Sequence, residues 1–239
     1  MSKSPIWVVA APGARKPRFS REQMAQVALA IADADGFEAL SMRRVADGLG
    51  AGTMTLYYYV RTKEDLLTLV EDALVGEIVT ACEPLPRPWR AALSKLANAA
   101  RTTYLRHDWS LRAMSGVRIG PNALRHIEQS LQALANVDLA LSLKLEILSI
   151  VDDYVTGHCL RKSAGHGQPE LDRKTARALS EAMERHLDES DFPQLRALIG
   201  DDTPFDALMK HSTFMTQDRH FDIGLDALLD GLSKRFKLK

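Results

Sequence analysis

The chain has 239 residues, enough for one large domain or two small ones with a buried core. Nonpolar residues make up 46% and charged residues 26%, as in ordinary soluble globular proteins, and the longest nonpolar stretches are too short to span a bilayer. The net charge is zero, yet residues 1–63 carry nine Lys and Arg against five Asp and Glu. A basic head on a mildly acidic body is typical of nucleic-acid binding, although differences of this size also arise by chance.

The chain holds two cysteines, Cys82 and Cys159, too few for a disulfide framework. Small buried thiols of this kind are typical of core positions and fit the reducing cytoplasm. His158 precedes Cys159, but no further ligand follows at helical spacing. We therefore expect no metal site and no cofactor.

Residues 1–19 are predicted to form a flexible basic tail. Pro5, Pro12, Gly13 and Pro17 interrupt any helix there, and the run from Arg15 to Arg18 is basic. Such a segment is either a tolerated disordered terminus or an arm that contacts phosphates or the minor groove.

Helical periodicity begins after Ser20, which forms a capping-box pattern with Gln23. Gly36 closes this first helix. Three further short or medium helices are expected next, with a tight turn at Gly50, where glycine supplies the positive φ. They begin after Ser41, at Thr53 and after Thr62.

The remaining pattern is also helical, and no strand alternation or internal repeat is visible. Prolines 84, 86 and 88 mark a junction, and further helices are expected at about 89–106, 121–135, 138–162, 170–187 and 218–236. The prediction is an all-α chain: residues 20–67 form a three-helix helix-turn-helix DNA-binding domain, and residues 68–239 form a larger helical ligand-binding and dimerisation domain.

The stretch from Ser41 to Lys63 carries the functional signal. In a helix-turn-helix the second helix enters the major groove, and flanking side chains hold phosphates. Threonine hydroxyls and methyl groups suit base edges, whereas tyrosine hydroxyls and lysine suit the backbone.

Tyr57, Tyr58 and Tyr59 admit a second interpretation as an aromatic core cluster. Three consecutive helical residues span about 200° of the helix circumference. All three rings cannot face inward, so at least one is expected on the surface beside Arg61 and Lys63.

These residues closely resemble the DNA-binding domain of TetR-type repressors over residues 20–70. The matching segments are Val45-Ala46, Leu49-Gly50, Thr55-Leu56-Tyr57, Tyr59-Val60 and Lys63-Glu64-Asp65-Leu66-Leu67. A shorter match relates residues 221–232 to the closing segment of the tetracycline-repressor-like C-terminal domain.

The resemblance implies a homodimeric repressor of a palindromic double-stranded DNA operator. A small-molecule inducer would enter the C-terminal domain, move the fourth helix and release the DNA. Carried over by position, the DNA contacts are Arg43, Thr53, Met54, Thr55, Tyr57, Tyr58, Tyr59 and Lys63.

The ligand is expected to differ from the tetracycline–magnesium complex. In an ungapped count, the two histidines of the tetracycline-binding branch fall on Val79 and near Ala113 and Met114, and its drug-gripping amides fall on Leu96 and Ser130. We expect a more nonpolar ligand. The candidate pocket residues are Tyr104, Trp109, Met114, Ser130, Tyr154 and His158, each of which also fits a filled core position.

Several alternatives stay open. Asp152 and Asp153 interrupt a nonpolar helix: one lines the pocket or bonds across a dimer, or both lie on an exposed edge. The dimer interface is predicted to bury Leu141, Leu145, Leu148, Leu225, Leu229 and Leu232.

Two other functions compete with the ligand-relieved repressor. A constitutive helix-turn-helix protein would bind DNA without an inducer. An all-helical enzyme is also conceivable, although no nucleophile elbow, glycine-rich phosphate loop, zinc motif or paired-carboxylate motif is present; we expect no enzymatic activity.

Overall fold

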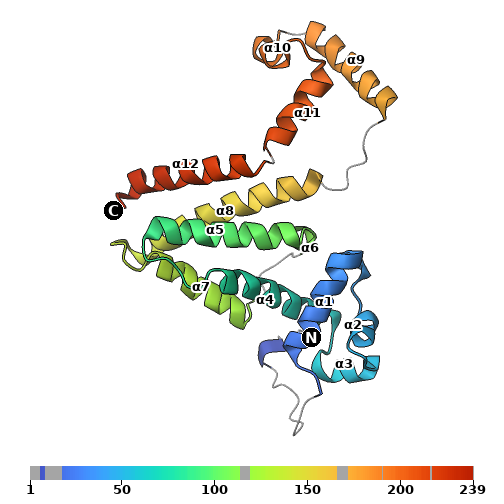
Figure 1. Cartoon of the computed structure of the whole chain (residues 1–239), viewed down its shortest axis with the longest axis vertical. Coiled ribbons are helices and arrows are strands. Elements are labelled where there is room, and N and C mark those ends of the chain that lie inside the picture. The colour runs from blue at the N-terminus through green and yellow to red at the C-terminus, as the bar shows by residue number, and fades with distance from the viewer. Residues whose placement is uncertain are drawn as a thin grey trace. The chain divides into compact units, whose positions relative to one another are not determined.

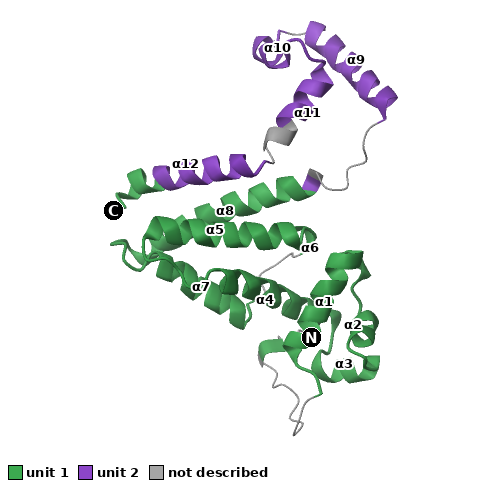
Figure 2. Ribbon diagram, viewed as in Figure 1, with its two compact units in different colours: residues 1–163, 232–239 green, residues 164–231 purple. Residues whose placement is uncertain are grey.

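The computed structural model describes residues 6–8, 18–113, 119–165, 172–189, 191–215 and 217–238. These residues form helices and connecting turns, with no strand among them, as the sequence predicted. Among the described helices, none combines the length and nonpolar composition that a membrane-spanning segment needs. The chain divides into two compact units, residues 1–163 with 232–239 and residues 164–231 (Figure 2).

The first unit begins with the head of the molecule (Figure 1). The head comprises α1 (Arg21–Asp35), a 3-10 turn (Phe37–Ala39), α2 (Met42–Gly48), α3 (Thr53–Tyr59) and the start of α4 (Lys63–Ala81).

Hydrogen-bonded caps are observed at the helix boundaries that the sequence predicted for the head. The Ser20 hydroxyl accepts from the Gln23 backbone N–H at 3.1 Å, and the Gln23 side chain accepts from the Ser20 N–H at 2.8 Å, completing the capping box. Gly36 ends α1 with a φ of +85°. The Thr62 hydroxyl caps α4 by accepting from the Asp65 N–H at 3.0 Å.

Four helices follow in the first unit. They are α5 (Trp89–Arg106), the short α6 (Ser110–Ala113), α7 (Pro121–Ala133) and most of α8 (Leu141–Gly165). Helix α4 packs against α1, α5 and α7, so it connects the head to the other helices. Its buried face includes Leu66, Leu69, Val70, Leu74 and Ile78.

The division into compact units follows packing and leaves the domain boundary at residues 67 and 68 a prediction. The head, α4, α5 and α7 belong to one unit, because α4 packs on elements from both sides of the proline-rich segment. Of residues 1–17, the structure describes Ile6–Val8, which form a 3-10 turn in which Ile6 is buried.

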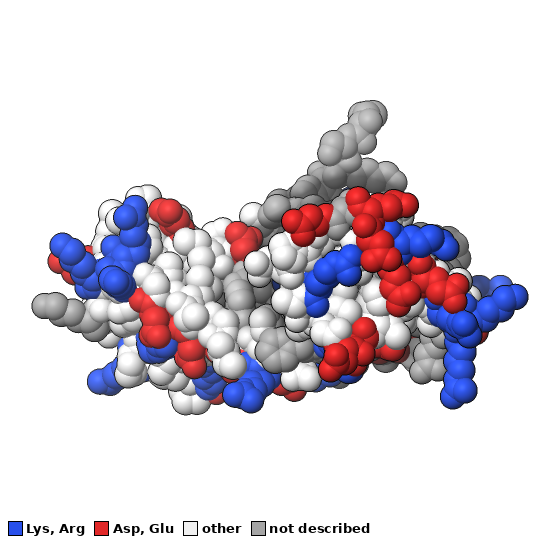
Figure 3. Space-filling view, turned by 90° about the horizontal axis from the view of Figure 1, so that it is seen from above, with Lys and Arg blue, Asp and Glu red and all other residues white. Residues whose placement is uncertain are grey.

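The second unit contains α9 (Arg173–Glu189), α10 (Pro193–Ile199), α11 (Pro204–Met215) and the greater part of α12 (Asp218–Phe236). Leu187, Ile199 and Ala207 form a small core there. The sequence prediction missed α10 and α11. The ion pairs of this unit include Arg177–Glu181 at 2.9 Å. Figure 3 shows one face of the whole chain, on which acidic side chains lie beside basic ones.

Candidate functional site

Helices α2 and α3 are held together by a tight turn. Gly50 adopts a φ of +62°, and the Ala51 N–H donates to the Ala46 carbonyl at 2.9 Å. Gly48 approaches α1 so closely that a Cβ there would lie 2.6 Å from Cγ1 of Val27. The turn and this close contact fix the direction of α3 relative to α1.

The exposed side of α3 carries three large side chains. Met54 is 82% exposed and Tyr58 is 61% exposed, and Tyr57 is exposed too. Positions 54, 57 and 58 are neighbours on one side of a helix. Thr53 and Thr55 are half-buried beside them. These large side chains are available to a partner. The exposure of Tyr57 and Tyr58 confirms the prediction that at least one of the three tyrosine rings faces solvent.

Two basic side chains flank this helix. Arg43 on α2 is exposed, with its Nε 3.9 Å from the Asp47 carboxylate, a distance that leaves the guanidinium available to another anion. Lys63 is exposed at the first position of α4. Arg61 is engaged with Asp65 at 3.6 Å. Exposed cations on both sides of α3 fit phosphates flanking a groove.

Tyr59 differs from the other predicted contacts. Its side chain is 7% exposed, and its hydroxyl accepts from the Arg18 backbone N–H at 3.2 Å. Phe19 packs edge-on against its ring, with 6.4 Å between ring centroids. Because its ring is buried and its hydroxyl is engaged, Tyr59 supports the domain from within and does not lie on the exposed side of α3.

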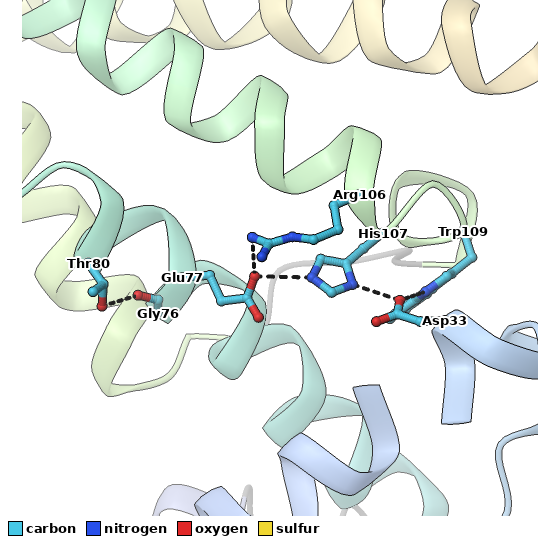
Figure 4. A network of polar contacts seen from close by, with 7 residues as sticks. All are labelled: Asp33, Gly76, Glu77, Thr80, Arg106, His107 and Trp109. Carbon is cyan, nitrogen blue, oxygen red and sulfur yellow. Dashed lines mark hydrogen bonds and ion pairs between the residues drawn. The ribbon is translucent and has the colours of Figure 1, made fainter. Parts of the chain in front are cut away.

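A polar network joins the head to the end of α5 (Figure 4). Asp33 of α1 accepts from Trp109 Nε1 at 2.8 Å and contacts His107 Nδ1 at 2.7 Å. The other ring nitrogen of His107 lies 3.1 Å from Glu77 of α4, which also accepts from Arg106 at 2.7 Å. His107 is buried, so this network fixes α1, α4 and the end of α5 to one another.

A second polar anchor joins α4 to α7. The buried Asp72 carboxylate accepts from the Asn122 N–H at 2.9 Å and from the Asn122 side-chain amide at 3.0 Å. It thereby caps the first turn of α7. Burial raises the pKa of Asp72 above its ordinary value, and these hydrogen bonds oppose the rise.

A cavity of about 430 Å³ opens between α5, α7 and α8 of the first unit. Nine of its fourteen lining residues are nonpolar: Leu93, Leu96, Ala97, Ala100, Ile127, Leu145, Leu148, Val151 and Val155. The polar residues are Tyr104, His126, Ser130, Ser149 and Asp152. A nonpolar wall with a few polar groups is the usual composition of a small-molecule site.

The predicted pocket residues separate into two groups. Tyr104 and Ser130 line the cavity, whereas Tyr154 and His158 do not, and His158 is buried. Trp109 stacks on Phe37 with 5.4 Å between ring centroids and belongs to the polar network. Met114 lies outside the described residues.

Most of the residues that build these sites carry no local sequence signal. Asp33 and His107 are 74 residues apart, and no local pattern links them. Leu96 and Ser130, the positions of the drug-gripping amides in the tetracycline branch, do lie in the cavity wall. Within the described residues, no group of three His, Cys, Asp or Glu side chains is placed to hold a metal ion.

A second hollow, of about 640 Å³, runs along α1, α4 and the first turn of α7. Its wall holds three arginines and three acids: Arg21, Arg106, Arg125, Glu22, Asp72 and Glu77. Asp72, Glu77 and Arg106 belong to the anchors already described. The less charged cavity between α5, α7 and α8 is therefore the better candidate for a small organic ligand.

Comparison with known proteins agrees with this arrangement. The family model of the tetracyclin repressor-like C-terminal domain matches residues 83–236, and that of bacterial regulatory proteins of the tetR family matches residues 26–70. The HTH-type transcriptional repressor DrrR1 of Streptomyces coeruleorubidus is 32% identical over 219 residues, covering 91% of this chain and 78% of that protein. An HTH-type transcriptional regulator of Saccharopolyspora erythraea is 33% identical over 182 residues, covering 75% of each chain.

Solved structures show the same fold. A possible TetR family transcriptional regulator from Streptomyces coelicolor A3(2) has a TM-score of 0.66 and 26% identity, covering 90% of this chain and 99% of that one. ActR from Streptomyces coelicolor in complex with actinorhodin has a TM-score of 0.63 and 28% identity, covering 90% and 95%. With its N-terminal helix-turn-helix and helical C-terminal domain, the chain belongs to the TetR family of DNA-binding transcriptional regulators.

Proposed function

We propose that the chain is a repressor that binds a palindromic operator as a homodimer and leaves it when a small molecule fills the cavity between α5, α7 and α8. The observation that carries the DNA-binding part is the exposed side of α3. Three large side chains project from it, and Arg43 and Lys63 flank it. We also propose a cytoplasmic location, because a repressor must reach the chromosome.

The side chains of the head divide into two kinds of DNA contact. Thr53, Met54 and Thr55, at the N-terminal end of α3, would meet base edges in the major groove. Tyr57, Tyr58, Arg43 and Lys63 would bind backbone phosphates. Tyr59 would act indirectly, since its buried ring supports the helix.

The link between ligand and operator would run through α4. Asp72 on α4 is bonded to the start of α7, and Glu77 on α4 is bonded to the end of α5. Both α5 and α7 line the cavity, and α4 packs on α1 of the head. A ligand that separates α5 from α7 would pull on α4 through these two anchors and change the spacing of paired α3 helices.

The likeness to ActR supports a ligand-responsive function. ActR has been solved with actinorhodin and with (S)-DNPA, at 28% and 26% identity to this chain. These two ligands are those of ActR. The ligand class proposed for this chain follows from the polar residues of its own cavity wall.

The test begins by selecting operator DNA from a random duplex library with the purified protein. We expect an inverted repeat to be enriched, and we expect Lys63→Ala to lower the salt slope of the dimer's affinity by about 1.8, because each of the two subunits loses one phosphate contact. Lys174→Ala, an exposed lysine on α9, should leave the slope unchanged. Enrichment of no sequence by the folded protein would contradict operator binding.

The ligand part is tested by a thermal-shift screen of lipophilic metabolites and drugs against the same protein. Hits are retested for release of the selected operator. A compound that both stabilises the protein and releases DNA supports the repressor. Operator binding that no stabilising compound reverses would favour the constitutive DNA-binding protein instead.

A further inference from the structure

One carboxylate in the cavity wall has no compensating charge. Asp152 lines the cavity from α8, and among the described residues it has no hydrogen-bond or ion-pair partner. The neighbouring Asp153 carboxylate adds repulsion. The fourteen lining residues include no lysine and no arginine.

The surroundings of Asp152 favour a positive partner. Asp152 and Asp153 are both exposed to solvent at this edge of α8, yet partial desolvation of Asp152 and the adjacent Asp153 charge raise the pKa of Asp152. Both effects disfavour an isolated carboxylate, and a cation beside it would relieve both. Attraction between opposite charges is also stronger at a partly nonpolar site than in bulk water.

The other polar groups of the wall are neutral at neutral pH. Burial and the nearby Asp152 charge raise the pKa of Tyr104, so its phenol stays protonated. Burial lowers the pKa of His126, so its ring stays uncharged. Ser130 and Ser149 add hydroxyls. The wall therefore presents one negative charge, several neutral hydrogen-bonding groups and a nonpolar majority.

We propose that the effector of this protein is a nonpolar molecule bearing one protonated amine, with the amine held by Asp152 and the body packed among the leucines and alanines of α5 and α8. The inference rests on the proposed function, in which this cavity is the effector site. A cavity of about 430 Å³ lies within the range for ligands of drug-like size.

The experiment uses a matched pair of fluorescent probes on the full-length protein. Monodansylcadaverine carries a primary amine on a nonpolar dansyl group, and its N-acetyl derivative has the same body without the charge. Dansyl emission rises in nonpolar surroundings, so titration gives both dissociation constants. We expect the wild type to bind the amine about tenfold more tightly than the acetylated probe, as a charge-assisted contact implies.

Two matched variants assign the preference to one carboxylate. Asp152→Asn should reduce the preference to within about twofold and leave the affinity for the acetylated probe unchanged. Asp153→Asn removes the same formal charge one residue away, outside the lining residues, and should keep most of the preference. Equal binding of both probes to the wild type, an unchanged preference in Asp152→Asn, or no binding of the amine would overturn the inference.

A third variant separates this inference from the proposed function. Ser130→Trp, at a lining residue of α7, places a large ring in the cavity, and its fold is checked by circular dichroism. If Ser130→Trp binds neither probe and the wild type shows no preference for the amine, only the cationic ligand class is refuted. Binding of both probes unaffected by Ser130→Trp would refute the cavity as the probe site and count against the proposed function as well.

Discussion

At the scale of single residues, the three consecutive tyrosines of α3 show how one local pattern serves two purposes. Tyr57 and Tyr58 are exposed, and Tyr59 is buried with its hydroxyl bonded to the Arg18 backbone. Helical geometry required at least one exposed ring. Which ring turns inward depends on Phe19 and Arg18, about forty residues earlier, and the local sequence does not encode that contact.

The two tyrosines predict opposite effects of the same substitution. Tyr58→Phe removes a hydroxyl available to DNA, so operator affinity should fall about fivefold, with the melting temperature unchanged. Tyr59→Phe leaves the Arg18 N–H without its acceptor, so the free energy of unfolding should fall by about 1 kcal/mol. Operator titration and urea unfolding of both variants measure the two effects. A larger loss of affinity in Tyr59→Phe than in Tyr58→Phe would reverse our assignment.

His126 makes stability depend on pH in a defined direction. Burial lowers its pKa in the folded protein, so between its folded value and the ordinary value near 6.5 the unfolded chain binds more protons. Stability attributable to His126 is therefore present at pH 7.5 and declines as the pH falls below about 6.5.

The change that tests this is His126→Gln, which removes the titrating ring. The difference in melting temperature between pH 7.5 and pH 5.5 should be smaller in this variant than in the wild type. All other histidines are present in both proteins, so they cancel in the comparison. An equal or larger difference in the variant would show that His126 does not titrate as stated.

At the scale of helices, α4 is the element on which the others depend. It packs on α1, α5 and α7, and its Asp72 and Glu77 hold the ends of two helices that line the cavity. The sequence predicted the helix and its cap from Thr62 and Asp65. It did not predict the two anchors, because the partners lie 30 to 50 residues away.

The polar network predicts a difference between two aspartates of the same helix. Asp33→Ala leaves Trp109 Nε1 and His107 Nδ1 without their acceptor, which should lower the free energy of unfolding by about 1–3 kcal/mol. Asp35→Ala removes only an exposed ion pair with Arg44, which should cost at most about 1 kcal/mol. Both changes replace an aspartate by alanine in the last turn of α1, so the difference between their urea midpoints reports on the network. Equal losses in the free energy of unfolding would show that the network contributes no more to stability than an exposed ion pair.

How well the remaining helices could be predicted depends on how regular their nonpolar spacing is. The regular spacing of Phe221, Leu225 and Leu229 predicts α12, and the predicted bounds agree with the structure. The short α10 and the partly polar α11 have weak periodicity, so they were missed. Helix α8 begins at Leu141, three residues after the predicted cap at Asp138.

At the scale of the whole molecule, burial divides the leucines predicted for the dimer interface. Leu225, Leu229 and Leu232 are already buried in a single chain, whereas Leu141 is 61% and Leu145 is 48% exposed. A charge at Leu229 would therefore disrupt folding and report nothing about association. Leu141, which is exposed on α8 and lies outside the cavity wall, is the proper site for the test.

Leu141→Glu should convert the proposed dimer to a monomer in light scattering, because a buried interface does not tolerate one added charge from each subunit. Leu124→Glu, at a leucine of α7 that is 59% exposed, serves as the matched control and should stay dimeric. A Leu141→Glu variant that stays dimeric would place the interface elsewhere.

The central claim is that paired α3 helices read a palindromic operator. Its most direct test is a hydroxyl-radical footprint of the selected operator bound by the wild type and by Tyr58→Ala with Lys63→Ala. We predict two symmetric protected patches related by the palindrome, with half-sites separated by about one or more helical turns, and loss of both patches in the double variant at equal protein concentration. A single asymmetric patch, or a footprint that the double variant leaves intact, would contradict the claim.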